Sequence, residues 1–263
     1  MSPGSVAWPA ALPDRLNLVL FDSIEIAAPL PRTDARAMHV LEVLRRAEGD
    51  SFDVGQVNGP RGRAVLRRIT PEHLELEFAW GVPMPPRLPL ALLAGLPRPQ
   101  TARKILVDAA TLGVTTLQFV ATERSDPNYA ASTLWTSGEW RRHLLAGAAQ
   151  AFDTRIPDVS WDKSLKQTMG IVAGANDSGE RERIPLLLAL DNYEASMRLG
   201  EVDVGPLRPV CLALGPERGW GAGDREILRE AGFVLAHLGE SVLRTETAVV
   251  AALAILAGRQ GRM

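Results

Sequence analysis

LALGPERGWGAGDREILREAGFVLAHLGESVLRTETAVVAALAIL, residues 212–256, is the stretch that decides the fold of this chain. Its pattern of apolar and glycine residues predicts a strand, a glycine-rich loop, a helix, a second strand, a tight loop and a second helix. The two loops, residues 215–220 and 239–244, directly follow the two strands. Open α/β sheets bind ligands at the carboxyl ends of their strands. The stretch therefore predicts a ligand-binding site made by these two loops.

The rest of residues 83–263 continues the alternation of strands and helices. The apolar runs LPLALLA, VTTLQFV, IPLLLAL and RPVCLAL predict buried strands. Helices are predicted at residues 101–113, after Ser137 as an N-cap, and at residues 162–169, with a polar loop at residues 174–183. Strands that are apolar throughout and alternate with helices indicate an α/β domain whose mostly parallel sheet is covered on both faces.

Residues 16–82 predict a separate small domain that is rich in β structure. The run LNLVLF predicts a strand, and a β-hairpin follows around the glycine-rich loop at residues 58–62. The alternating run HLELEFAW predicts a further strand. One helix is predicted from Thr33, as its N-cap, to Gly49.

Two stretches mark the limits of these domains. GVPMPPRLP holds four prolines in nine residues, which excludes a central strand and predicts a linker between the domains. Residues 1–15, rich in proline and alanine, predict a frayed or disordered N-terminus.

The composition is that of a soluble globular protein. The 263 residues are 46% hydrophobic and 23% charged, and the net charge of −2 excludes a uniformly basic nucleic-acid-binding protein. Any nucleic-acid site must therefore be a local patch. Cys211 is the single cysteine, which excludes an internal disulfide, and no apolar run reaches the length that spans a membrane. No signal peptide is visible, so we expect a cytoplasmic protein.

Several common cofactor-binding and catalytic sites are excluded because the chain lacks their sequence motifs. GWGAGD lacks the last glycine of a dinucleotide fingerprint, and the chain has no P-loop, no H-E-x-x-H, no C-x-x-C and no G-x-S-x-G. The four histidines are scattered, so no metal site is predicted. His237 lies on a predicted strand and is interpreted as a hydrogen-bonded core residue.

Arg244 is the anomalous residue of the second loop. Thr245 is predicted to cap the following helix, and Glu246 lies in its first turn, where the helix dipole favours a carboxylate. A cation at the same place is mildly unfavourable, so Arg244 suggests a functional role, such as holding a phosphate or a reacting base. The alternative is a structural salt bridge to Glu217 or Glu246. The first loop, taken alone, is equally compatible with an ordinary turn between a strand and a helix.

These two loops carry a resemblance to a known family. LGPE-x-G, followed by LG-x-x-VLRTETA, resembles the RsmE-like RNA uridine-N3 methyltransferases of small-subunit ribosomal RNA, in the SPOUT superfamily. Weaker matches extend along the chain: His39–Val40–Leu41 with Val43–Leu44–Arg45, Leu112–Gly113–Val114, Glu123–Arg124–Ser125, and Gln150 with Arg155 and Pro157.

The resemblance implies a fold, a cofactor and partners. It implies a C-terminal SPOUT-type α/β domain with a trefoil knot, a PUA-like N-terminal domain that grips RNA, and a homodimer with no metal and no membrane association. The cofactor is S-adenosyl-L-methionine, and the partner is 16S ribosomal RNA or the small ribosomal subunit. The residues implied to hold the cofactor are Leu190, Leu214, Gly215, Pro216, Glu217, Gly219, Leu238, Gly239, Val242, Leu243, Arg244 and Thr245. Arg244 is also the hypothesised catalytic residue, which orients the uridine or stabilises its anion.

The RNA-binding residues come partly from the resemblance and partly from the arginines of the hairpin. Arg61, Arg63 and Arg67 alternate along a predicted strand, which places them on one face, although a solvated edge kept charged against aggregation is an equally good interpretation. The full predicted set is His39, Arg45, Arg46, Arg61, Arg63, Arg67, Arg124, Gln150 and Arg155.

Several positions depart from the family's pattern. Arg218 stands where the family has glycine, and Ser241 where it has arginine or lysine. On the expected substrate side, the departures are Asp108, Thr111, Ala149 and Asp153. Two alternatives therefore remain open: a diverged paralogue that binds RNA without methylating it, and a methyltransferase with a different RNA or small-molecule target.

Overall fold

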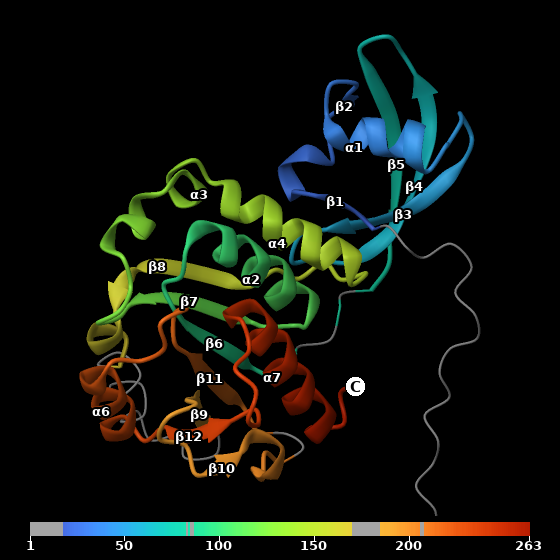
Figure 1. Ribbon diagram of the computed structural model, residues 1–263. Coiled ribbons are helices and arrows are strands. Elements are labelled where there is room, and N and C mark those ends of the chain that lie inside the picture. The colour runs from blue at the N-terminus through green and yellow to red at the C-terminus, as the bar shows by residue number, and fades with distance from the viewer. Residues whose placement is uncertain (1–17, 83, 85–86, 170–184, 206–207) are drawn as a thin grey trace, which may run out of the picture. The chain divides into compact units, whose positions relative to one another are not determined.

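The computed structural model describes residues 18–82, 84, 87–169, 185–205 and 208–263. Contacts divide the chain into two units, residues 1–84 with 152–154, and residues 85–151 with 155–263 (Figure 1). The predicted frayed N-terminus and the predicted polar loop at residues 174–183 lie outside the described residues.

The first unit is built on a five-stranded sheet with the order β1-β3-β4-β5-β2. Strand β1 runs parallel to β3, and the other neighbours are antiparallel. Phe52, Leu66 and Leu74 of the sheet pack with Val40 in one apolar core. The elements are β1 (Val19–Phe21), η1 (Ser23–Glu25), β2 (Leu30–Pro31), α1 (Ala35–Met38), the π-helical η2 (His39–Val43), β3 (Ser51–Gln56), β4 (Arg61–Ile69) and β5 (His73–Trp80).

The helix of this unit differs from its prediction at both ends. The prediction of Thr33 as N-cap was wrong: the carboxylate of Asp34 caps the helix, because it accepts a hydrogen bond of 2.8 Å from the Arg36 N–H. The helix ends at η2, well before Gly49. The chain then passes through Arg45, whose φ of 52° is in the left-handed region.

A short segment from much later in the sequence completes the first unit. Thr154 Oγ1 donates a hydrogen bond of 2.6 Å to the Gly59 carbonyl, and the Asn58 N–H donates one of 2.8 Å to the Thr154 carbonyl. The hairpin loop is therefore anchored by residues 152–154, which the predicted boundary at residue 82 assigns to the second domain.

The second unit is a seven-stranded sheet with the order β10-β12-β9-β11-β6-β7-β8. All neighbouring strands in it are parallel, which confirms the predicted α/β class with a mostly parallel sheet. The strands are β6 (Leu90–Gly95), β7 (Thr116–Ala121), β8 (Asp158–Ser164), β9 (Leu186–Leu190), β10 (Met197–Arg198), β11 (Val210–Leu214) and β12 (Val234–His237). The helices are α2 (Pro99–Thr111), η3 (Pro127–Ala131), α3 (Thr133–Thr136), α4 (Glu139–Gln150), η5 (Leu199–Glu201), α6 (Ala222–Glu230) and α7 (Thr245–Arg259).

Both faces of this sheet are covered. Leu92 and Leu212 belong to an apolar cluster with residues of α2 and α7, whereas their neighbours Leu93 and Ala213 belong to a second cluster with Leu228 of α6. Figure 1 shows α2, α4 and α7 on one side of the sheet and α6 apart from them. Alternate residues of β6, β9 and β11 thus serve different cores, which explains why these strands are apolar throughout.

Two local predictions in this unit were wrong. Residues 162–164 belong to strand β8, and only residues 165–169 are helical. Gly138, not Ser137, is the N-cap of α4, because the Ser137 hydroxyl donates instead to the Thr133 carbonyl of the preceding turn. None of the described helices is long and apolar enough to cross a membrane.

Candidate functional site

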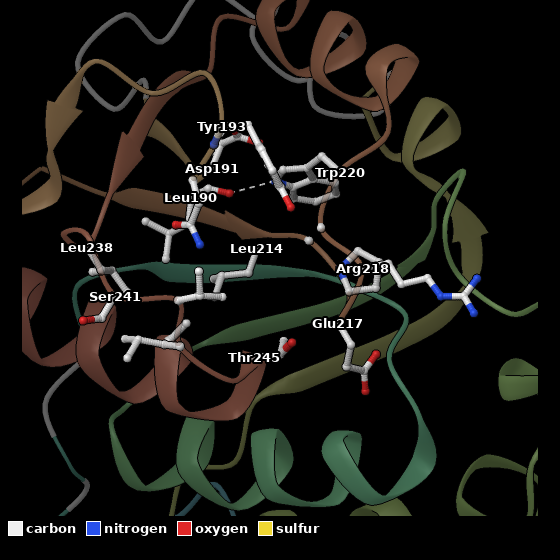
Figure 2. Close-up of a pocket in the computed structure, with 17 residues that line it drawn as sticks. Leu190, Asp191, Tyr193, Leu214, Glu217, Arg218, Trp220, Leu238, Ser241 and Thr245 are labelled. Carbon is white, nitrogen blue, oxygen red and sulfur yellow. Dashed lines mark hydrogen bonds between the residues drawn. The ribbon is translucent and has the colours of Figure 1, made fainter.

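A cavity lies where the two predicted loops and the loop after β9 meet, at the carboxyl ends of neighbouring strands (Figure 2). Its volume is about 200 Å³. We call it the strand-end cavity. It is lined by Leu190, Asp191, Asn192, Tyr193, Leu214, Gly215, Pro216, Glu217, Arg218, Gly219, Trp220, Leu238, Ser241, Val242, Leu243, Thr245 and Ala248.

The loop after β11 is so tightly folded that it needs its glycines. A Cβ atom on Gly215 would lie 2.9 Å from the carbonyl carbon of Gly219. One on Gly95, in the neighbouring strand, would lie 2.4 Å from Pro216 Cδ. Gly219 itself has a φ of 68°, which favours glycine. Backbone atoms therefore form this wall of the cavity, and a ligand can approach them closely.

A buried ion pair holds the loop after β9. Arg225 Nε donates a hydrogen bond of 2.7 Å to Asp191 Oδ2, and both side chains are almost completely buried. Asp191 Oδ1 accepts from the N–H groups of Tyr193 and Glu194, at 2.8 and 2.6 Å. The carboxylate thus fixes the backbone that places Tyr193 at the cavity.

Trp220 braces the same loop from the opposite side. Its ring is buried, and its Nε1 donates a hydrogen bond of 2.9 Å to the Leu190 carbonyl. Figure 2 shows this bond joining the end of the loop after β11 to the end of β9. The two loops are therefore held against each other by a satisfied buried donor.

Glu217 turns its carboxylate toward the start of α2. Glu217 Oε1 accepts hydrogen bonds from the Arg98 N–H at 3.1 Å and from Thr101 Oγ1 at 2.8 Å, and Arg98 Nε lies 3.4 Å away. A carboxylate at a helix N-terminus is stabilised by the helix dipole. Its side chain thus joins the cavity loop to α2.

The start of α7 differs from its prediction. Thr245 is the first helical residue, and Arg244 occupies the N-cap position without a side-chain capping bond, so the prediction that Thr245 caps the helix was wrong. Lys104 Nζ binds Glu246 at 2.9 Å, and this bond is the main cause that lowers the pKa of Glu246. Among the described residues, the exposed Arg244 guanidinium forms no hydrogen bond or ion pair, so the alternative of a structural salt bridge to Glu217 or Glu246 is not observed.

The strand-end cavity brings together all but two of the residues expected to hold the cofactor. Gly239 and Arg244 are the exceptions. Gly239 turns at a φ of 125° and donates its N–H to Nδ1 of His237, and this bond agrees with the interpretation of His237 as a hydrogen-bonded residue. Arg244 lines a separate hollow beside the cavity.

The sequence reasoning missed part of the cavity lining. Asp191, Tyr193 and Trp220 were not predicted, although an Asp-Asn pair directly after an apolar strand is a turn signal. Arg218 and Ser241, identified as departures from the family's pattern, both line the cavity.

Comparison with known proteins identifies the family to which this chain belongs. A profile described as an RNA methyltransferase domain matches residues 84–257, which include every element of the strand-end cavity. The chain belongs to this RNA methyltransferase family. It is 30% identical over 250 residues to ribosomal RNA small subunit methyltransferase E of Treponema pallidum, with 92% of this chain and 90% of that protein covered. It is 26% identical over 247 residues to ribosomal RNA small subunit methyltransferase E 1 of Borreliella burgdorferi, with 93% and 98% covered. The predicted family is therefore confirmed.

A solved structure shares the fold of this methyltransferase. The crystal structure of ribosomal RNA small subunit methyltransferase E from Neisseria gonorrhoeae, bound to S-adenosyl methionine, superposes with a TM-score of 0.71 at 23% identity. The alignment covers 92% of this chain and 97% of that one.

Most of the predicted RNA-binding residues of this methyltransferase lie in the first unit, and several arginines there are already paired. Arg61 Nη1 donates to the Phe152 carbonyl, and its guanidinium lies 5.4 Å from the centre of the Phe152 ring. Arg63 binds Ser51 Oγ and lies 3.7 Å from Asp53, and Arg67 binds Glu77. His39 is half-buried in η2, Arg45 is exposed, and Arg46 Nε is buried without a hydrogen-bond partner among the described residues.

The other three predicted RNA-binding residues lie in the second unit. Arg124 Nη1 donates a hydrogen bond of 2.7 Å to the Arg218 carbonyl, so it borders the cavity loop. Gln150 is exposed at the end of α4, and Arg155 is half-buried after it. Within the described residues, no group of three His, Cys, Asp or Glu side chains is arranged to hold a metal ion.

Proposed function

We propose that this protein transfers a methyl group from S-adenosyl-L-methionine to N3 of a uridine in 16S ribosomal RNA. The observation that carries the proposal is the strand-end cavity, in which the LGPE-x-G and LG-x-x-VLRT segments meet within a domain of the RNA methyltransferase family. The relatives named ribosomal RNA small subunit methyltransferase E support the choice of substrate.

The cavity suits the proposed cofactor. Leu190, Leu214 and Leu238 supply the apolar wall that an adenine ring needs, and the glycine loop leaves backbone groups open to polar atoms. The Neisseria relative of the same fold was solved bound to S-adenosyl methionine. When bound, this cofactor supplies an electrophilic methyl group carried on a sulfonium.

Arg244 is the proposed catalytic residue. Uracil N3 would have to lose its proton, to water, before attacking the methyl carbon. The carbon–sulfur bond would break as the new carbon–nitrogen bond forms, with S-adenosylhomocysteine as the leaving group. A cation close to the ring favours the deprotonated base. Arg244 is exposed, forms no direct ion pair among the described residues, and lines the hollow beside the cavity, where Glu246 is the nearby carboxylate. It is therefore available to orient the uridine or to stabilise its anion.

The finer architecture is also part of the proposal. We assign residues 16–82 to a PUA-like RNA-binding domain and residues 83–263 to a SPOUT domain whose chain forms a trefoil knot around the cavity loops. The protein works as a homodimer in the cytoplasm, where the small ribosomal subunit is its partner. Exposed Arg45 supports RNA contact by the first unit, because a guanidinium suits phosphate.

Two measurements test the proposal. Calorimetry of the purified dimer should detect one molecule of S-adenosylmethionine per chain. Mass spectrometry of small-subunit RNA, from a strain lacking the gene and from subunits treated with the enzyme and cofactor, should show N3-methyluridine only after treatment.

The outcomes separate the proposal from its rivals. Cofactor binding without N3-methyluridine would favour a different target, and the exposed Arg218 at the cavity would be the first residue to revert to glycine. RNA binding without cofactor binding would favour a diverged paralogue that does not methylate.

A further inference from the structure

A second hollow, of about 500 Å³, lies beside the strand-end cavity. We call it the helix-start hollow. Glu217, Val242, Leu243 and Thr245 line both spaces, so they form the partition between them. The remaining lining residues are Arg98, Gln100, Thr101, Lys104, Arg244 and Glu246.

Two long helices begin at this hollow, and an arginine precedes each of them. Arg98 is the N-cap of α2 and Arg244 is the N-cap of α7, and neither makes a side-chain capping bond. A cation at a helix N-terminus opposes the helix dipole. Two such arginines at one hollow favour a bound anion, although the carboxylates of Glu217 and Glu246 already lie at the two helix starts.

Thr245 is the second observation that points to a ligand. Its side chain lies in the partition, and the residue is only 8% exposed. Its hydroxyl has no hydrogen-bond partner among the described residues. Figure 2 labels Thr245 near Leu214 and Glu217, and all three residues line the strand-end cavity. The Thr245 oxygen is not among the fully buried atoms that lack a partner, so it can be reached by a ligand in either space.

Charge distinguishes this hollow from its neighbour. The helix-start hollow has three cations, Arg98, Lys104 and Arg244, against the carboxylates of Glu217 and Glu246. A further hollow, which shares Arg98 and Glu217 with it, is charge-balanced. It is lined by three arginines and three carboxylates: Arg98, Arg124, Arg218, Glu123, Asp126 and Glu217. The helix-start hollow is therefore the one that attracts an anion.

Arg98 is free to bind that anion. Its side chain is 62% exposed, and its Nε lies 3.4 Å from Glu217, a long contact. Glu217 keeps the bonds from Thr101 Oγ1 and the Arg98 N–H when the guanidinium moves away. Releasing Arg98 therefore leaves no carboxylate unsatisfied.

We propose that the helix-start hollow binds the target nucleotide of the RNA, with the Arg98 guanidinium holding its phosphate. The base then lies against Arg244 and the Thr245 hydroxyl, next to the strand-end cavity. Arg98 is a positioning residue here, and the inference rests on the proposed function.

The test compares Arg98→Ala and Arg98→Lys with Arg142→Ala, which removes an exposed arginine of α4 that lines neither hollow. The substrate is small ribosomal subunits that lack the methyl group. For Arg98→Ala we expect the KM for subunits to rise roughly ten- to a hundredfold, with kcat nearly unchanged. The slope of log affinity against log salt should fall by about one unit. Arg98→Lys should keep the slope, and Arg142→Ala should match the wild type in KM.

One further measurement makes the outcome decisive. S-adenosylmethionine affinity, measured by calorimetry, should be the same in all variants, which also shows that they are folded. This inference alone would be overturned if the wild-type enzyme methylates subunits and the Arg98→Ala variant has the same KM and the same salt slope as the wild type. A wild-type protein that neither binds the cofactor nor methylates subunits would overturn the proposed function and this inference with it.

Discussion

Arg225 and Asp191 form an ion pair of 2.7 Å that is buried in the second unit, beside the strand-end cavity. The same carboxylate accepts the N–H groups of Tyr193 and Glu194. The Arg225 guanidinium also lies 5.3 Å from the centre of the Tyr193 ring. One charge pair thus fixes both the backbone and the aromatic side chain at the cavity wall.

Asp191→Asn is expected to destabilise the protein strongly. It removes the buried partner of Arg225 and leaves only the half-exposed Glu194 carboxylate, 3.6 Å from Nε, so the free energy of unfolding should fall by up to about 3–5 kcal/mol. Urea unfolding followed by tryptophan fluorescence measures this. The control is Arg229→Ala, which breaks the exposed pair with Glu194 and should cost at most about 1 kcal/mol. Equal effects of the two substitutions would contradict the assigned role of the buried pair.

Gly95→Ala is expected to weaken cofactor binding. The new Cβ would lie 2.4 Å from Pro216 Cδ and 2.7 Å from the Pro216 nitrogen, so the loop after β11 must shift. Overpacking of this kind costs about 1–3 kcal/mol, and if that cost falls on the bound state the Kd for S-adenosylmethionine rises roughly tenfold. Titration calorimetry with S-adenosylmethionine measures this Kd.

Gly258→Ala is the matched control for Gly95→Ala. No atom lies within 4 Å of its added Cβ, and the residue is in helix α7. It should leave the Kd unchanged and raise the free energy of unfolding by about 0.5–1 kcal/mol. A wild-type Kd in Gly95→Ala would show that the loop tolerates the displacement.

The sheet of the second unit was predictable because its signals are local. Each buried strand is a continuous apolar run, and each cavity loop follows its strand directly in the sequence. Strand β8 was missed because Asp158, Asp162 and Lys163 make it polar, as an edge strand allows. Three helix N-caps were each predicted one residue away from the true N-cap. The predicted residues, Thr33, Ser137 and Thr245, are direct neighbours of the N-caps in the structure.

The contacts that stabilise the site were not predictable, because they join distant residues. Arg225 meets Asp191 across 34 residues, and Thr101 meets Glu217 across 116 residues. The sequence predicts loop composition but not which distant side chain fills the space beside a loop. Tyr193 illustrates this: its exposed ring lines the cavity only because Asp191 fixes its backbone.

Glu139 is expected to make stability depend on pH in the acid range. Arg103 of α2 binds its carboxylate through two bonds of 2.8 and 2.9 Å, His143 lies 3.0 Å away, and these partners lower the pKa of Glu139 from 4.5 to about 2. A lowered pKa in the folded state contributes stability that is present above pH 4.5 and is lost as the pH falls toward 2.

Urea unfolding of the wild type and of Glu139→Gln at several pH values tests this dependence. The wild type should be more stable at pH 6, and the difference between the two proteins should disappear as the pH approaches 2. A difference that stays constant across this range would rule out the ion pair as its source.

Cys211 is expected to resist thiol reagents while the protein is folded. It lies on the central strand β11, and burial raises the pKa of its thiol to about 12, so almost no thiolate exists at pH 8. Ellman's reagent should react with the single cysteine, at one equivalent per chain, only after the protein has been denatured. Rapid reaction of the native protein at pH 8 would contradict the raised pKa of the half-buried Cys211.

Thr245 is expected to show opposite effects on stability and on activity. Thr245→Val keeps the shape of the side chain and removes a hydroxyl that has no partner among the described residues. The free energy of unfolding should therefore stay the same or rise by up to about 1 kcal/mol, because a poorly satisfied polar group is replaced by a methyl group. If the hydroxyl bonds to a ligand, kcat/KM should fall roughly tenfold in the same variant. Thr245→Ser keeps the hydroxyl and should keep most of the activity. A structural threonine would lose stability and activity together in Thr245→Val, whereas a ligand-binding threonine loses only activity, and this separation is what the two assays measure.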